Sequence, residues 1–306
     1  MKSFVEKERG CETAFQTNAP FWHLLTPGGQ SWLIFKDDDD MKFAMTLMAR
    51  CSCEFSEIKI LTFVLMNNHI HVVASGPLSS LSSFFDTFRR RVIRYLSNQG
   101  LNLLPDSLKE TIIPITDLRT LRNTIAYVNR NGFVVDPSQT PFSYHWGAGC
   151  CFFNIQPVGK KYSELQFNKK RLLCKSRVAD FPESFEVLDG YISPASFCDI
   201  NTATSFFRDA HHYLSLLMKN VEAYQEMAKE LHDRIFLTDE ELYSQVLRIC
   251  RDEYKASGIK DLTKIQRLEL ANTIHYKFNA SNEQIRRILM LLDSEVNRLF
   301  PLSAKK

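Results

Sequence analysis

The chain has 306 residues, a length that favours two compact units over one. Apolar residues make up 44% and charged residues 24%, a globular composition that excludes the disordered and fibrous classes. The longest apolar runs, such as IKILTFVLM, are shorter than the roughly 20 residues of a membrane helix, and MKSFVEKERG contains no apolar signal-peptide core. We therefore expect a cytoplasmic protein with no membrane partner.

The net charge of +3 does not by itself indicate a nucleic-acid partner, but the distribution of charge does. Between Phe84 and Asn131 there are eight Lys or Arg residues against four Asp or Glu residues. The C-terminal stretch is also net basic. These two segments are the candidates for contact with an acidic partner.

The first half of the chain alternates strand-like and helix-like stretches, which predicts an α+β domain around one sheet. WHLLTP and SWLIF predict a hairpin across Gly28 and Gly29. Asp37 to Asp40 form the acidic first turn of a predicted helix that runs to about Cys53. IKILTFVLM and HIHVVAS then predict a second hairpin around Asn67 and Asn68.

Apolar residues recur at helical spacing from Leu81 to about Ser97, which predicts a core-packed helix with a basic outer face. TIIPIT predicts a short strand. Asp117 then caps a predicted helix, LRTLRNTIAYVNRN, that ends at Gly132. The expected order is strand, strand, helix, strand, strand, helix, strand and helix.

A change of composition after Pro141 predicts two domains, residues 1–158 and 159–306, of which the second is mostly helical. Thr238 with Glu241, and Ser281 with Gln284, have the spacing of capping boxes. The final segments IQRLELANTIHYKF, NASNEQIRRILML and LDSEVNRLF predict three helices with short turns. Their spacing is typical of a helix-turn-helix over about residues 262–300.

His69 and His71 alternate along one predicted strand, so both imidazoles point to the same face and can bind one metal ion. By itself, the pattern is more typical of two polar residues on the solvent face of a strand. Asn123, Tyr127 and Asn131 lie four residues apart, so a phenol and two amides share one helical stripe. That stripe also fits a core tyrosine followed by an asparagine before the helix end.

The segments LMNNHIHVV and LRNTIAYVNRNGFVVDPSQTPFSYHW resemble the single-tyrosine HUH transposases, in particular the REP-associated tyrosine transposases and related transposase-like proteins. In that family a strand ending M-P-N-H-x-H supplies two metal ligands, and a helix reading Y-(three residues)-N-P supplies the nucleophile. The resemblance covers about residues 20 to 147, and Asn67 and Gly132 replace the two prolines. It implies a ferredoxin-like antiparallel sheet with helices on one side, followed by a mostly α-helical C-terminal domain.

The same resemblance implies that Tyr127 is the nucleophile and that His69, His71 and Asn131 bind Mg²⁺ or Mn²⁺. A divalent cation polarises the phosphate of single-stranded or hairpin DNA, so that Tyr127 attacks it and forms a 5′-phosphotyrosine link. The reverse reaction joins strands without ATP. Members of the family commonly act as dimers, so the resemblance implies a homodimer, although no segment of the chain marks an interface.

Seven arginines are predicted to bind DNA: Arg89, Arg90, Arg91, Arg94, Arg130, Arg286 and Arg287. Those on the helix after Leu81 either follow a phosphate backbone or form a solvated face with Asp86 as an ion partner. Near the C-terminus, Asn282, Gln284 and the two arginines face DNA if the segment is a reading head; a purely structural helical hairpin is the alternative. Tyr144 and Trp146 either stack on an unpaired base or cover the sheet.

Two other functions fit these residues. The replaced prolines and the long C-terminal extension fit a domesticated DNA- or RNA-binding regulator that has lost turnover. A metal hydrolase that uses water is a third reading. Only the transposase-like reading predicts a covalent adduct that Tyr127→Phe abolishes.

Overall fold

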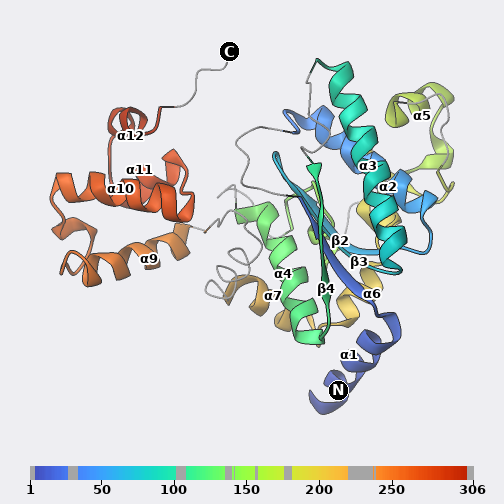
Figure 1. Cartoon of the computed structure of the whole chain (residues 1–306), viewed down its shortest axis with the longest axis horizontal. Coiled ribbons are helices and arrows are strands. Elements are labelled where there is room, and N and C mark those ends of the chain that lie inside the picture. The colour runs from blue at the N-terminus through green and yellow to red at the C-terminus, as the bar shows by residue number, and fades with distance from the viewer. Residues whose placement is uncertain are drawn as a thin grey trace. The chain divides into compact units, whose positions relative to one another are not determined.

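The computed structural model describes residues 4–26, 34–100, 108–134, 140, 142–155, 158–175, 181–219, 237 and 239–301 (Figure 1). The chain divides into two compact units, residues 1–133 with 139–220 and residues 134–138 with 221–306. The predicted boundary near residue 158 therefore does not coincide with the boundary between the units. None of the helices in the described ranges has the length and apolar character needed to cross a membrane.

The first unit is a mixed α+β structure, as the sequence predicts. It begins with eight elements: α1 (Phe4–Asn18), β1 (Phe21–Leu25), α2 (Asp38–Glu54), β2 (Lys59–Leu65), β3 (Ile70–Ser75), α3 (Leu78–Asn98), β4 (Thr111–Ile115) and α4 (Leu118–Val134). Asp37 caps α2, because its side chain accepts a hydrogen bond from the Asp40 amide at 3.0 Å.

The first predicted hairpin differs from the structure in the part that is described. Ser31 to Leu33 lie outside the described residues, and Ile34 and Phe35 are not in a strand. Their backbone amides both donate to the carbonyl oxygen of Asn67, at 2.7 and 3.0 Å. This segment is therefore tied to the turn between β2 and β3.

Four antiparallel strands form the main sheet in the order β2-β3-β1-β4. The predicted hairpin of β2 and β3 is confirmed, with Asn67 and Asn68 in its turn. Leu25 of β1 lies opposite His71 of β3, and His23 lies opposite Val73. Because side chains alternate along a strand, this register puts His23 and His71 on the same face.

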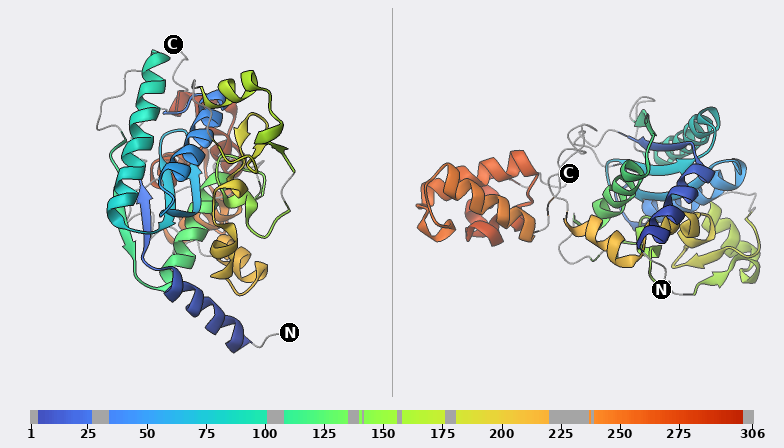
Figure 2. Two further views of the ribbon diagram at one scale, coloured as in Figure 1. Left: turned by 90° about the vertical axis from the view of Figure 1, so that its right-hand side faces the viewer. Right: turned by 90° about the horizontal axis from the view of Figure 1, so that it is seen from below.

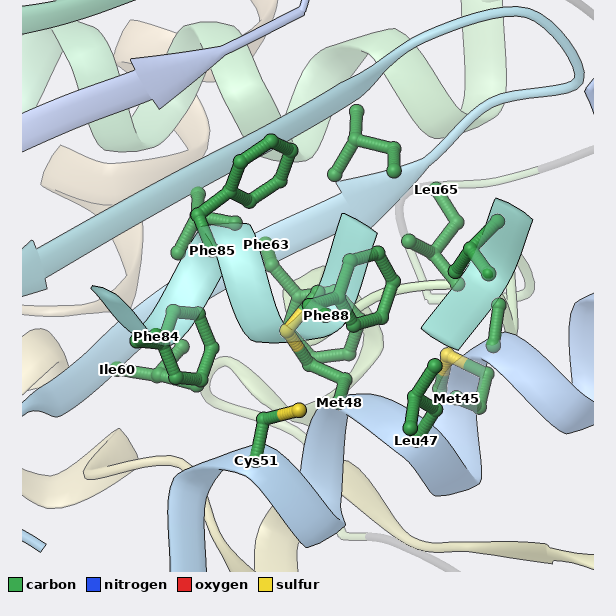
Figure 3. Packing of buried hydrophobic residues seen from close by; sticks show 14 of the residues in the cluster. Met45, Leu47, Met48, Cys51, Ile60, Phe63, Leu65, Phe84, Phe85 and Phe88 are labelled. Atoms are coloured by element: carbon green, nitrogen blue, oxygen red, sulfur yellow. The ribbon is translucent and has the colours of Figure 1, made fainter. Parts of the chain in front are cut away.

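Helices lie on both faces of this sheet, so the expectation of helices on one side is wrong (Figures 1 and 2). On one face, α2 and α3 pack their apolar side chains against Leu24, Ile60 and Val72 (Figure 3). On the other face, Tyr127 of α4 contacts the rings of His23 and His71. Figure 3 shows that the first of these layers consists of interlocked phenylalanine, methionine and leucine side chains.

Helix α4 begins as predicted but continues past Gly132 to Val134, so Gly132 does not end it. Thr120 donates to Asp117 from its hydroxyl at 2.6 Å and from its backbone amide at 2.8 Å, and these two bonds lower the pKa of the Asp117 carboxyl. A Cβ atom at position 132 would lie within 3.0 Å of three ring carbons of Tyr144. Gly132 is therefore needed for the close approach of Tyr144.

Residues 158–175 and 181–219 also belong to the first unit and are less helical than predicted. They contain a small antiparallel sheet of β5 (Lys160–Lys161), β6 (Glu186–Leu188) and β7 (Tyr191–Ile192). Their helices are α5 (Phe167–Cys174), α6 (Ile200–Ser205) and α7 (Ala210–Lys219), with short 3₁₀ turns at Tyr162–Glu164 and Pro194–Ser196. Another 3₁₀ turn, Gly149–Cys151, precedes this segment. The side chains of Tyr162, Phe181 and Ile192 form a cluster with Ala49 of α2, which anchors the segment.

The second unit is helical, with α9 (Asp239–Asp252), a 3₁₀ turn at Ile259–Asp261, α10 (Lys264–Phe278), α11 (Asn282–Leu289) and α12 (Asp293–Leu299). The three predicted C-terminal helices are therefore confirmed. Ser281 and Gln284 form the predicted capping box at the start of α11. Thr238 lies outside the described residues. A separate apolar core, which includes Val246, Ile274 and Ile285, holds the helices together.

Candidate active site on the polar face of the sheet

The face of the sheet that α4 covers carries three histidines. His71 lies in β3, His69 immediately precedes that strand, and His23 lies in β1. The ring centroids of His69 and His71 are 5.0 Å apart, and those of His23 and His71 are 5.3 Å apart. The structure thus brings together the two predicted ligands and adds a third imidazole.

Each predicted histidine ligand has a polar neighbour at its Nδ1 atom. Nδ1 of His69 lies 2.7 Å from Oδ1 of Asn68, and Nδ1 of His71 lies 3.1 Å from Nε2 of His23. An amide oxygen only accepts hydrogen bonds, so His69 donates from Nδ1 and carries its lone pair on Nε2. If His71 likewise donates from Nδ1 to His23, both histidines present Nε2 as the metal-binding nitrogen.

Tyr127 belongs to α4, and its ring packs against the rings of His71 and His23. Its ring centroid is 5.5 Å from that of His71, at an interplanar angle of 87°, and 6.3 Å from that of His23. The predicted nucleophile and a predicted metal ligand are therefore in edge-to-face contact. Asn131 is one helical turn further along α4, which places it on the same stripe of the helix as Tyr127.

The donor set of His69, His71 and Asn131 suits a divalent cation of intermediate hardness, because it combines two imidazole nitrogens with an amide oxygen. All three residues are at most 1% exposed. Among the described residues there is no cluster of three or more His, Cys, Asp or Glu side chains that could hold a metal. A metal at this face would therefore need Asn131, substrate oxygen or water to complete its coordination.

Other polar side chains of α4 anchor the helix. Oγ1 of Thr62 donates to Oδ1 of Asn129 at 2.5 Å, and Nδ2 of Asn129 donates to the hydroxyl of Tyr213 at 3.0 Å. Burial raises the pKa of the Tyr213 hydroxyl, so it remains protonated at neutral pH. Arg122 donates to the carbonyl oxygen of Phe206 at 2.6 Å. These bonds hold α4 between the sheet and the segment that contains α6 and α7.

Arg130 is also part of this scaffold, which removes it from the predicted DNA-binding set. The side chain is 3% exposed and donates from Nη1 to the carbonyl oxygen of Leu217 at 2.8 Å. Arg130 is next to Asn131 in sequence, but at this helical offset it points toward α7.

The arginines of α3 differ from one another in their surroundings. Arg89 and Arg90 both pair with Asp86, at 2.5 and 3.1 Å, and Arg91 pairs with Glu54 of α2 at 2.8 Å. Arg94 is exposed and makes no ion pair with any residue of the described ranges. The predicted basic face is therefore mostly neutralised by carboxylates, and Arg94 is its least compensated member.

The polar residues predicted to face DNA from α11 have intramolecular partners. Gln284 is 7% exposed and donates to the carbonyl oxygen of Leu237 at 2.8 Å, so that prediction is wrong. Asn282 donates to the carbonyl oxygen of Phe300 at 2.9 Å. Arg287 pairs with Asp239 at 2.8 Å, and Arg286 pairs with Asp293 at 3.3 Å.

Tyr144 and Trp146 cover protein surfaces. The hydroxyl of Tyr144 donates to the carbonyl oxygen of Leu65 at 2.7 Å, and burial raises the pKa of that hydroxyl. The ring of Trp146 lies 5.7 Å from that of Tyr191. Of the two predicted roles for this aromatic pair, covering the sheet is therefore the one that the structure supports.

Comparison with known proteins adds no identification. The chain matches no protein-family model, no curated protein and no solved structure.

Proposed function

We propose that this protein cleaves and rejoins single-stranded or hairpin DNA through a covalent bond to Tyr127, in the manner of a single-tyrosine transposase. The observation that carries the proposal is the contact of Tyr127 with the ring of His71, centroid to centroid at 5.5 Å. A phenol beside two imidazoles that share one face combines a nucleophile with metal-binding nitrogens, which suits metal-assisted attack on a phosphodiester. Neither the histidine motif nor the tyrosine helix predicts this contact by itself.

Each residue of the site has a role in this proposal. His69, His71 and Asn131 would hold Mg²⁺ or Mn²⁺, which supplies positive charge to the phosphate and lowers the barrier to attack. The phenolate oxygen of Tyr127 forms the new bond to phosphorus, and the 3′ oxygen of the cleaved strand leaves. The phenolic proton goes to a neighbouring base or to water. Because the phosphotyrosine conserves the bond energy, a free 3′-OH can reverse the step without ATP.

The decisive experiment incubates the purified protein with labelled DNA hairpins from the sequence that flanks its own gene, in the presence of Mn²⁺. The expected product is a protein–DNA adduct that survives denaturation. Tyr127→Phe should abolish the adduct, a loss of at least about 10³-fold, because the nucleophile is removed. Thr124→Val is the matched control, since it alters a buried polar residue of the same helix whose hydroxyl donates only to the backbone carbonyl of Thr120.

A second candidate is a nucleic-acid-binding regulator that has lost turnover, and the burial of the site favours it. Tyr127 is 3% exposed, and His69, His71 and Asn131 are almost fully buried. A phosphodiester reaches the hydroxyl only after the side chains that cover it move. Retarded mobility of the same hairpins with no adduct, in wild type and Tyr127→Phe alike, would support this candidate and exclude the first.

A third reading, a metal hydrolase that uses water, predicts a different pattern in the same assay. Cleavage would persist in Tyr127→Phe and disappear in His69→Ala. Cleavage that requires both residues would support the tyrosine mechanism and exclude water as the nucleophile.

A further inference from the structure

A polar cavity lies on the side of the first unit that carries α2 and α3, away from the histidine face. Its volume is about 350 Å³, and its walls come from α2, α3 and the residues around Lys175 and Phe181. That volume is at the lower end of the range for small-molecule sites, about 300–1,000 Å³. Neither the proposed nucleophile nor the proposed metal ligands contribute to it.

The walls of this cavity are strongly cationic. Arg50, Arg91, Arg94 and Lys175 line it, and none of its described lining residues is acidic. Glu54 compensates two of these charges in part, since it accepts from Arg50 at 3.2 Å and from Arg91 at 2.8 Å. The carboxylate of Asp40 is also close, since it adds to burial in raising the pKa of the Tyr95 hydroxyl. Four positive charges thus face two nearby carboxylates. A ligand with about two negative charges would neutralise the excess.

Lys175 and Arg94 are the two cations that have no carboxylate partner in the described part of the chain. Lys175 donates from Nζ to the hydroxyl of Tyr95 at 2.7 Å and lies 4.4 Å from the centroid of that ring. Both contacts are to a neutral group, so they orient the ammonium without cancelling its charge. Arg94 is exposed at the same cavity.

A buried hydroxyl also lines the cavity. Thr46 of α2 is 3% exposed, and its Oγ1 has no hydrogen-bond partner in the protein. A buried hydroxyl without a partner is destabilising, typically by about 1–3 kcal/mol. A ligand oxygen in the cavity would satisfy it.

The rest of the lining is aromatic and apolar. Phe43 and Tyr95 are stacked, with centroids 3.9 Å apart and an interplanar angle of 21°, and Leu47 and Phe181 contribute further apolar surface. A planar heterocycle can pack on such a wall. The cavity therefore combines a cationic end with a surface for a ring.

We infer that this cavity binds a nucleotide, with its phosphate among Arg94, Lys175 and Thr46 and its base against the aromatic wall. The nucleotide is either free or part of a DNA strand, because both present the same phosphate and base. This site is independent of the proposed chemistry at Tyr127, since it lies on the other side of the sheet.

The test measures binding of 5′-dAMP, deoxyadenosine, inorganic phosphate and the tetranucleotide d(AAAA) to the full-length protein by isothermal titration calorimetry. We expect 5′-dAMP or d(AAAA) to bind at least 10-fold more tightly than deoxyadenosine or inorganic phosphate. Binding of 5′-dAMP alone assigns a free nucleotide, and binding of d(AAAA) alone assigns a strand. Binding of neither, or equal binding of inorganic phosphate, would overturn the inference.

Matched variants locate the binding. Arg94→Gln should weaken the tighter ligand at least 10-fold, whereas Arg90→Gln, on the same helix but outside the cavity lining, should leave it unchanged. Thr46→Val keeps the size of the side chain and should weaken binding without loss of the folded state, checked by circular dichroism. Equal effects of the Arg94 and Arg90 variants would overturn the assignment. Tyr127→Phe should bind normally, so this test is separate from that of the proposed function.

Discussion

The two faces of the main sheet are built from different kinds of side chain. The face toward α2 and α3 is covered by apolar residues, among them Phe84, Phe85 and Phe88, all fully buried (Figure 3). The face toward α4 is equally buried but carries imidazole, phenol, hydroxyl and amide groups. The same strands therefore support an apolar core on one side and a polar cluster on the other.

The difference separates the side chains that stabilise the fold from those of the proposed active site. Burial of apolar area stabilises the fold at roughly 25 cal/mol per Å², with no requirement for exact partners. A buried polar group stabilises little even when it is hydrogen-bonded, and costs free energy when it is not. Since an all-apolar face would pack at least as well, the grouping of His23, His71 and Tyr127 at one face supports the proposed site at Tyr127.

The largest expected effect on stability is on the apolar face. Phe88→Ala should lower the free energy of unfolding by about 3–5 kcal/mol, because it removes a fully buried ring and leaves a cavity. Tyr127→Phe keeps the ring contacts with both histidines and should change the free energy of unfolding by about 1 kcal/mol or less. Urea denaturation of both variants measures the difference, and similar losses in the two would contradict the division between the faces.

The next largest expected effect is on the affinity for Mn²⁺, through His23, the neighbour of His71. His23→Leu removes the ring nitrogen that lies 3.1 Å from Nδ1 of His71, so it should lower the affinity for Mn²⁺ by about 10–100-fold. The measurement is a titration with Mn²⁺ followed by electron paramagnetic resonance. Thr124→Val, at a buried residue of α4 whose hydroxyl donates to the backbone of its own helix, should leave the affinity unchanged. Unaltered Mn²⁺ affinity in His23→Leu would show that His23 is only a packing residue.

His23 also shows where prediction from the sequence ends. One histidine inside FWHLL has no local feature that distinguishes it from a buried strand residue. Its position beside His71 depends on the register of β1 with β3, which sequence spacing does not specify. His69 and His71 could be paired from sequence alone because both lie on one strand, where alternation determines their direction.

The same contrast between local and distant signals holds for the other elements. The Asp37 cap and the apolar spacing in α3 depend on neighbours in the chain, and both predict the observed helices. Strands β5 and β7 have only two residues each, too few to show alternation, so the small sheet was not predicted. Which faces of the main sheet carry helices also depends on contacts between distant segments.

A smaller effect on stability is expected at Gly132, whose contact with Tyr144 joins two separate segments of the chain. Gly132→Ala places a Cβ atom within 3.0 Å of ring carbons of Tyr144 and should cost about 1–3 kcal/mol, although alanine is the better helix former. Gly10→Ala is the matched control, since a Cβ atom there meets nothing within 4 Å and should stabilise α1 by up to about 1 kcal/mol. Thermal unfolding should therefore show opposite shifts for the two substitutions, and shifts of the same sign would contradict the close packing of Tyr144.

The smallest expected effect is the change of the free energy of unfolding with pH that comes from the contact between α1 and α4. Arg122 of α4 hydrogen-bonds Glu8 of α1 at 2.6 Å, which lowers the pKa of Glu8. Burial, followed by the charges of Arg208 and Arg122, lowers the pKa of nearby His212. In both cases the folded state releases its proton more readily than the unfolded state, so the unfolded state binds more protons at acid pH.

Stability from both groups is therefore complete above the unfolded pKa of His212, about 6.5, and falls as the pH is lowered. The loss linked to His212 begins below about pH 6.5, and the loss linked to Glu8 begins below about pH 4.5. His212→Asn should flatten the upper part of the curve of unfolding free energy against pH, and Glu8→Gln the lower part. A wild-type curve that rises as the pH falls from 7 to 4 would show that these two groups do not determine its slope. Because the groups are partly solvated, each contribution is expected to be small.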